Sequence, residues 1–277
     1  MMKGAFNSLF EKKREQIKSL IFTKGRLIER VLYSHFFEDE DSSQCIKALK
    51  AYQNKDGGFG NGIEPDLLCP HSSAIGAETA LYYIDLLGDF PKERRESLEK
   101  WVLNSVNAQG FIPHPFEEVF EYPHQKWWEN PDKDRILAIS GLLKKMGFQD
   151  DEFYSKVESY YDSSDPLEEL ALYNYPKFLY LKYSKRSPNQ DKTYDKILDL
   201  FPKFRESHKS HYPIWSRYWY LIIPDLEEEL VLKSAKHFLS NIDDEGGIPN
   251  PYDELPWWKP IFTLDGVILL KINGYIG

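Results

Sequence analysis

The chain has 277 residues, long enough for one large domain or two small ones, and folding should bury about 75% of its unfolded surface. The formal net charge of −9 repels a phosphate backbone, so we expect no nucleic-acid partner. No apolar run approaches the ~20 residues that span a bilayer, and residues 1–37 lack the apolar core of a signal peptide. Two isolated cysteines, Cys45 and Cys69, suit a reducing compartment. We therefore expect a cytoplasmic protein without a transmembrane segment.

The first predicted helix pair is joined by a glycine turn. Gly57-Gly58 can end one helix, and Ser72-Ser73 can start a second one over residues 74–87, whose sequence leaves almost no polar face. Such a helix is buried on nearly all sides, as an inner helix would be. The more amphipathic segments 96–105 and 227–240 are typical of outer helices.

The plan of helix, glycine turn, proline-rich loop and helix occurs three times, in residues 48–88, 100–147 and 236–274. Apolar residues at helical spacing in 166–184 and 212–223 indicate degenerate repeats between the second and third copies. No alternation typical of strands occurs in the chain.

These repeats predict an all-α fold, an α/α toroid of about five to six helix-pair repeats. No long linker interrupts the pattern, so we predict a single domain over residues 1–277. Within it, residues 1–41 would form N-terminal helices and residues 42–277 the repeats.

The clearest copy of the turn is Gln53-Asn54-Lys55-Asp56-Gly57-Gly58-Phe59-Gly60. This segment resembles the repeat signature of the terpenoid cyclase and protein prenyltransferase superfamily. In squalene-type cyclases and prenyltransferase β-subunits, such turns join an outer helix to an inner one. The glycines permit positive φ, Gln53 can hydrogen-bond loose backbone ends, and Phe59 can pack between helices. The likeness covers roughly half of the chain.

The resemblance implies a central cavity onto which the loop before each inner helix opens. It would place Glu64, Asp66, Cys69 and His71 at the mouth of that cavity. Prenyltransferases bind zinc through Asp-x-Cys and a distant His, but Asp66 and Cys69 are three residues apart. We therefore predict no metal site, with Asp66, Cys69 and His71 as the residues that a zinc ion would use.

The two reactions typical of cyclases lack their motifs here. The D-x-D-D motif of class II cyclases is absent from the chain. The acidic segments 38–41 and 243–245, which a magnesium-dependent enzyme could use, lie in predicted turns. Zinc and magnesium stay open as cofactors, and neither has a clear motif.

Four residues are candidates for acid/base catalysis: Glu64, Asp66, His71 and Glu78. Pro65 holds Glu64 extended, so the first two carboxylates could act as acid and base, or they could cap helices or bind arginine. His71 and Glu78 are seven residues apart and would share one face of a helix. Facing a cavity they would form an acid/base pair; otherwise Glu78 is a buried acid that needs a donor.

The candidates for substrate binding are two tryptophan pairs and polar residues of neighbouring loops: Trp127, Trp128, Trp257, Trp258, His114, His124, Asp253 and Glu254. The indoles could stabilise carbocations or stack on sugars, or they could wedge between helices, which we favour for at least one of each pair. The loop residues could form a catalytic mouth or a solvated surface.

We predict an isoprenoid-processing enzyme with an aromatic-lined cavity and a carboxylate acid at its mouth, and two further functions stay open as alternatives. The first alternative is a carbohydrate-active enzyme that uses paired carboxylates and tryptophan platforms. The second is a non-catalytic toroid that binds a lipid or a protein. In this second alternative Glu64, Asp66, His71 and Glu78 would each be held by structural hydrogen bonds. We expect a small-molecule ligand, apolar or carbohydrate, for either enzyme.

Overall fold

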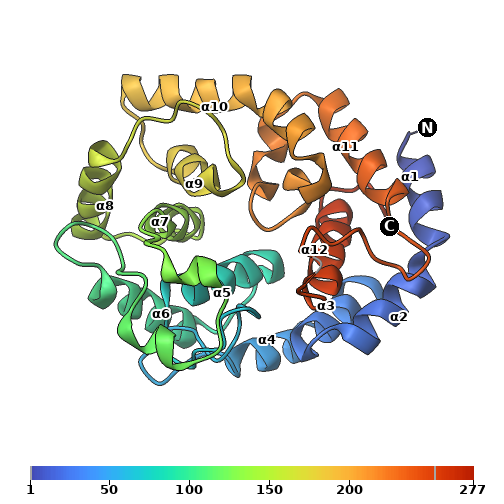
Figure 1. Ribbon diagram of the computed structural model, residues 1–277, viewed down its shortest axis with the longest axis horizontal. Coiled ribbons are helices and arrows are strands. Elements are labelled where there is room, and N and C mark those ends of the chain that lie inside the picture. Colours follow the sequence, from blue (N-terminus) through green and yellow to red (C-terminus); the bar gives the residue numbers. More distant parts are fainter. Residues whose placement is uncertain (1, 253) are drawn as a thin grey trace. The chain divides into compact units, whose positions relative to one another are not determined.

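The computed structural model describes residues 2–252 and 254–277, and all regular elements in them are helical (Figure 1). The all-α prediction is therefore confirmed for the described residues. None of their helices is long and apolar enough to cross a membrane. The α-helices are α1 (Met2–Glu11), α2 (Arg14–Lys24), α3 (Leu27–Phe37), α4 (Ser43–Lys50), α5 (Ala74–Leu87), α6 (Lys92–Ser105), α7 (Arg135–Lys145), α8 (Asp151–Ser163), α9 (Tyr175–Tyr183), α10 (Pro188–Ser207), α11 (Glu228–Ser240) and α12 (Trp258–Ile272).

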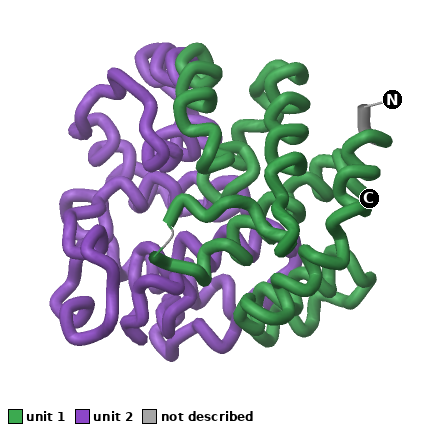
Figure 2. Tube along the Cα trace, turned by 45° about the vertical axis from the view of Figure 1, so that its right-hand side comes forward, with its two compact units in different colours: residues 1–48, 198–277 green, residues 49–197 purple. Residues whose placement is uncertain are grey.

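The chain forms two compact units, coloured separately in Figure 2. Unit 1 combines residues 1–48 with 198–277, and unit 2 consists of residues 49–197. Helices α4 and α10 each carry the chain from one unit into the other.

The three central helices of unit 2 are α5, α7 and α9, and α7 contacts both of the others. The Oγ of Ser73 caps α5 by accepting a hydrogen bond from the Gly76 N–H (3.1 Å). All of α5 except its last three residues is buried, as its apolar sequence predicts. Helices α7 and α9 approach closely, because a Cβ at Gly141 would lie 2.6 Å from the carbonyl oxygen of Leu179.

Unit 1 brings the two ends of the sequence together. Helix α12 packs against α2 and α3, and α1 packs against α11. The backbone N–H of Gly277 donates a hydrogen bond to the side-chain oxygen of Asn7 (2.9 Å). The N-terminal helices are therefore part of the same core as the third predicted repeat.

Each of the three predicted turns closes with the same two backbone hydrogen bonds. In each turn, a glycine N–H donates to the carbonyl of the Asn or Asp three residues earlier. The N–H of that Asn or Asp donates to the carbonyl of the residue that follows the glycine. The glycines have φ between 87° and 96°, which a residue with a Cβ rarely adopts. An Asn or Asp side chain also accepts backbone N–H groups in each turn. The bonded sets are Asn54, Gly57 and Gly58; Asn107, Gly110 and Phe111; and Asp243, Gly246 and Gly247.

The positive-φ glycine of each turn also touches the backbone of another helix. A Cβ added to it would come within less than 3.0 Å of that backbone. Gly57 lies against α6, Gly110 against α8, and Gly246 against α2. The glycine is thus required twice, once by φ and once by the close approach. In the first turn, the Gln53 amide also donates to the carbonyls of Gly57 and Arg94 (2.9 Å each), as the sequence predicted.

The segment 212–223 does not form the regular helix that its spacing indicated. It contains the short 3-10 helix Pro213–Trp215 and most of a second one, Tyr220–Asp225. Tyr212 has φ of 45°, which is outside the α-helical region, and Pro224 near the end of the second short helix cannot donate a backbone hydrogen bond. The amphipathic helices α6 and α11 form as predicted.

Replacing Gly110 by alanine should destabilise the protein more than replacing Gly147. Both glycines have positive φ in unit 2, but nothing lies within 4 Å of a Cβ at Gly147. We expect Gly147→Ala to cost about 1 kcal/mol for the backbone alone, and Gly110→Ala about 1–3 kcal/mol more for displacing α8. Urea unfolding of both variants measures the difference. Equal losses would show that the contact with α8 is unimportant.

Candidate functional site

The loops before α5 and α7 pair with each other within unit 2, and this brings several candidate residues together. Leu67 forms an isolated antiparallel bridge with His124, and the Leu68 N–H donates to the Pro123 carbonyl (3.0 Å). The Gln125 N–H donates to the backbone carbonyl of Asp66 (3.1 Å). The paired loops hold the Glu64-Pro65-Asp66 segment beside the first tryptophan pair of the chain, residues 127–128.

Glu64 and Asp66 are both buried, and each accepts a hydrogen bond from a different donor. The Thr79 hydroxyl of α5 donates to Glu64 Oε2 (3.0 Å). The Trp128 indole N–H donates to Asp66 Oδ1 (2.8 Å). The two carboxylates are therefore held by separate partners, as structural acids are.

Glu78 lies at the centre of a buried ionic network. Arg135, the first residue of α7, donates to Glu78 Oε2 (2.9 Å) and forms an ion pair with Asp132 (2.5 Å). The Tyr175 hydroxyl, at the start of α9, donates to the other oxygen, Glu78 Oε1. The network thus joins the three central helices of unit 2 through one carboxylate.

Burial shifts the proton affinities of this network. It raises the pKa of Glu78, against the opposing effects of the Arg135 charge and the Tyr175 hydrogen bond. It also raises the pKa of Tyr175 well above its usual range, and the neighbouring Glu78 carboxylate adds to that shift. Tyr175 therefore stays a neutral donor. With Asp132 included, two carboxylates share one guanidinium.

Each tryptophan pair has one exposed and one buried member. In unit 2, Trp127 is 42% exposed, whereas Trp128 is buried with the Arg135 guanidinium 5.2 Å from its ring centre. In unit 1, Trp257 is 36% exposed, whereas Trp258 is buried with a different guanidinium, that of Arg217, at 5.8 Å. The buried ring of each pair therefore already has a cation beside it.

Unit 1 has its own buried acid in an apolar helix. Asp265 of α12 accepts from Arg217 Nε (2.8 Å) and from its NH2 group (3.4 Å), and both residues are buried. The sequence reasoning missed this pair. The signal was available, because Asp265 interrupts an apolar helix just as Glu78 does.

His71 lies away from the buried acids. It is exposed and precedes α5, which begins at Ala74, so the expectation that it shares a helix face with Glu78 was wrong. Its ring is 6.2 Å from the ring of Tyr122. The Cys69 thiol points to the carbonyl of Glu118 (3.8 Å), and burial raises its pKa, which favours the thiol over the metal-binding thiolate.

The side chains that could bind a metal ion do not come together in the part of the chain that the structure describes. The described residues contain no group of three or more His, Cys, Asp or Glu side chains that could hold an ion. Asp66, Cys69 and His71 have the separate surroundings given above. In the acidic segment 243–245, Lys259 pairs with Asp243 and Glu245 (2.7 Å each), and Lys13 pairs with Asp244 (2.7 Å). Glu38 in the other acidic segment pairs with Lys18.

The predicted binding histidines have different environments. His114 is buried, its Nε2 lies 2.9 Å from the Trp128 carbonyl, and burial lowers its pKa. His124 is partly buried, and its Nδ1 lies 2.7 Å from the Tyr122 carbonyl. Glu254 is exposed in unit 1. The predicted Asp253 lies outside the described residues.

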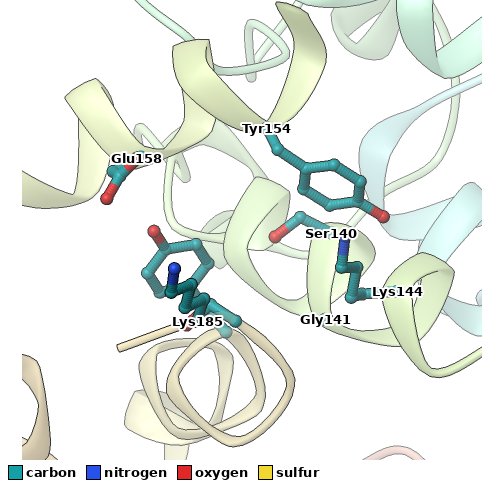
Figure 3. A pocket seen from close by; sticks show the side chains of 8 residues that line it. Ser140, Gly141, Lys144, Tyr154, Glu158 and Lys185 are labelled. Carbon is teal, nitrogen blue, oxygen red and sulfur yellow. The ribbon is translucent and has the colours of Figure 1, made fainter. Parts of the chain in front are cut away.

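A pocket of about 160 Å³ opens between α7, α8 and α9 in unit 2 (Figure 3). Figure 3 shows Tyr154, Glu158, Lys144 and Lys185 around it, with Ser140 and Gly141 on α7. None of the candidate residues from the sequence lines this pocket.

Comparison of the chain with protein-family models, curated proteins and solved structures finds no match.

The buried Glu78–Arg135 pair should show strong energetic coupling. We expect Arg135→Met to cost about 3–5 kcal/mol, because it leaves the buried Glu78 carboxylate without its cation. Glu78→Gln should cost less, because Arg135 keeps its ion pair with Asp132. The double variant should cost less than the sum by about 1–3 kcal/mol. Unfolding of the four proteins in urea measures this coupling.

The matched control is the exposed pair Glu152–Lys156 on α8 of the same unit, at 2.7 Å. Its coupling should be close to zero, because solvent screens both charges. If the two pairs gave equal coupling, the network around Glu78 would not be a specific structural feature.

Proposed function

We propose that this chain is a helix-pair repeat protein of the α/α-toroid kind that acts as a non-catalytic binding scaffold. One observation carries the proposal: Glu64, Asp66 and Glu78 each accept a hydrogen bond from a separate partner inside unit 2. His71, the fourth residue that a scaffold was expected to hold in this way, is exposed instead. An acid that performs catalysis must reach a substrate, and both oxygens of Glu78 already have donors. The recurrence of the glycine turn supports the toroid.

The surroundings of the tryptophans support the same proposal. A wall that stabilises carbocations needs ring faces directed at the substrate. Trp128 and Trp258 instead lie beside Arg135 and Arg217. We assign these two buried indoles, together with His114, to the packing of their loops.

The exposed indole of each tryptophan pair is the one that a ligand could contact. Trp127 and Trp257 present apolar surface at the first position of each pair. Stacking on such surface suits an apolar molecule or a sugar ring. The scaffold would therefore bind an apolar or carbohydrate ligand, or a protein that buries these rings.

An isoprenoid-processing enzyme is the second candidate. The three equivalent turns favour it, because they match the signature that resembles cyclases and prenyltransferases. In that case Glu64 or Asp66 would be the acid, after release from Thr79 or Trp128. The two proposals predict different effects of replacing Glu64 or Asp66. The enzyme would lose turnover, whereas the scaffold would keep its ligand binding.

Native mass spectrometry of gently purified protein, with metal analysis of the same sample, tests the two proposals. A retained ligand whose binding survives Asp66→Asn and Glu64→Gln supports the scaffold. We expect no turnover of squalene or linear prenyl diphosphates by the unsubstituted chain. Turnover that Asp66→Asn abolishes while the melting temperature stays within a few degrees would overturn the scaffold in favour of the enzyme.

A further inference from the structure

Unit 2 contains a second, larger pocket that the sequence did not indicate. Its volume is about 610 Å³, and its walls come from the end of α8, the loop that follows, α9 and the first turns of α10. Three lysines line it: Lys177, Lys192 and Lys196. No residue of the buried acid network lines this pocket.

Lys177 is unusual among the buried cations of the protein. Four basic side chains are buried in the described residues: Arg135, Lys177, Arg205 and Arg217. The three arginines each form an ion pair with a carboxylate. Lys177, only 7% exposed, forms no ion pair there and donates to the backbone carbonyl of Asp165 (2.7 Å). A buried lysine without a counter-charge is costly, so an anion in the pocket would stabilise it.

A second lysine of the pocket, Lys196, is exposed but also donates to a backbone carbonyl. Lys196 Nζ donates to the backbone carbonyl of Leu167 (2.8 Å), which is a neutral acceptor. Lys192 is exposed on the neighbouring turn of α10. The carbonyl contacts hold two ammonium groups at the pocket without neutralising them.

The start of α10 adds to the positive potential of the pocket. Asn189 and Gln190 of its first turn line the wall, and the helix is 20 residues long. The first N–H groups of a helix lack acceptors within it and favour a bound anion. In α10, Pro188 has no N–H and the Gln190 N–H donates to the Ser187 hydroxyl (3.4 Å), so the N–H that an anion would contact is that of Asn189. Asp162 and Asp165 also line the pocket, and water and salt screen their charges as they screen those of the exposed Lys192 and Lys196. The buried Lys177 is therefore the charge on which anion binding would depend.

We propose that this pocket binds a small phosphorylated molecule. Its phosphate group would contact Lys177, Lys196 and the first turn of α10, and the remaining volume would hold the rest of the molecule. The lysine ammonium groups and the Asn189 N–H together suit the several oxygens of a phosphate. This site is separate from the exposed tryptophans, so it stands whether or not the scaffold proposal holds.

Isothermal titration calorimetry at low salt tests the site with inorganic phosphate, pyrophosphate and malonate as probes. We expect saturable binding of phosphate or pyrophosphate that Lys177→Met weakens by about tenfold or more. Lys177→Arg, which keeps the charge, should retain most of the affinity. The control is Lys203→Met, an equal charge change on an exposed residue of α10 outside the pocket, which should bind as the original chain does.

Three results would overturn the proposal. They are the absence of saturable phosphate and pyrophosphate binding, equal weakening by Lys203→Met, and binding of malonate at least as tight, which would indicate a carboxylate ligand. Circular dichroism checks the fold of each variant. If Lys177→Met does not fold, Lys192→Met replaces it in the test. This variant removes an exposed charge of the same pocket and should weaken phosphate binding several-fold, and unchanged binding would contradict the proposal.

Discussion

The contact between a glycine turn and the backbone of another helix sets the arrangement of helices in both units. The turns at Gly57, Gly110 and Gly246 have one hydrogen-bond pattern, and each brings its glycine against a helix backbone at a distance that excludes a side chain. Because the turn cannot move outward without losing these contacts, the helices that it joins and the helix that it touches take fixed positions. The loops that follow the turns then reach the central helices, where the buried charges lie.

The buried charges determine how α5 and α12 are rotated about their own axes within that arrangement. Glu78 on α5 can be buried only where Arg135 and Tyr175 come to it, and Asp265 on α12 only where Arg217 does. An apolar helix by itself could pack in several rotations about its axis with similar burial. One carboxylate in each helix makes all but one of these rotations costly.

The local features of the fold could be predicted from the sequence because local chemistry determines them. The apolar sequence of α5 predicts its burial, Ser73 caps it, and the Asn or Asp before each glycine closes a turn. The cap also explains the error about His71, since a helix that starts after Ser73 leaves His71 in the loop.

The partners of the buried acids could not be predicted in this way. Glu78 is 57 residues from Arg135 and 97 from Tyr175 along the chain, and no periodicity connects them. The sequence indicates that Glu78 needs a donor, and only the packing of three helices identifies it. Lys177 is a similar case, because its apolar neighbours in α9 indicate burial but not the lack of a counter-charge.

The division of unit 1 between the two ends of the sequence has a consequence for biosynthesis. Unit 2 is continuous in the sequence, whereas α1, α2 and α3 can make their contacts with α11 and α12 only after the C-terminal region has been synthesised. Roughly 190 residues separate α3 from α11, which at about 5–20 residues per second is an interval of about 10–40 s. During that interval the apolar faces of the first three helices have no native partner from the C-terminal region. The order of synthesis therefore leaves these faces exposed until the C-terminal helices have emerged.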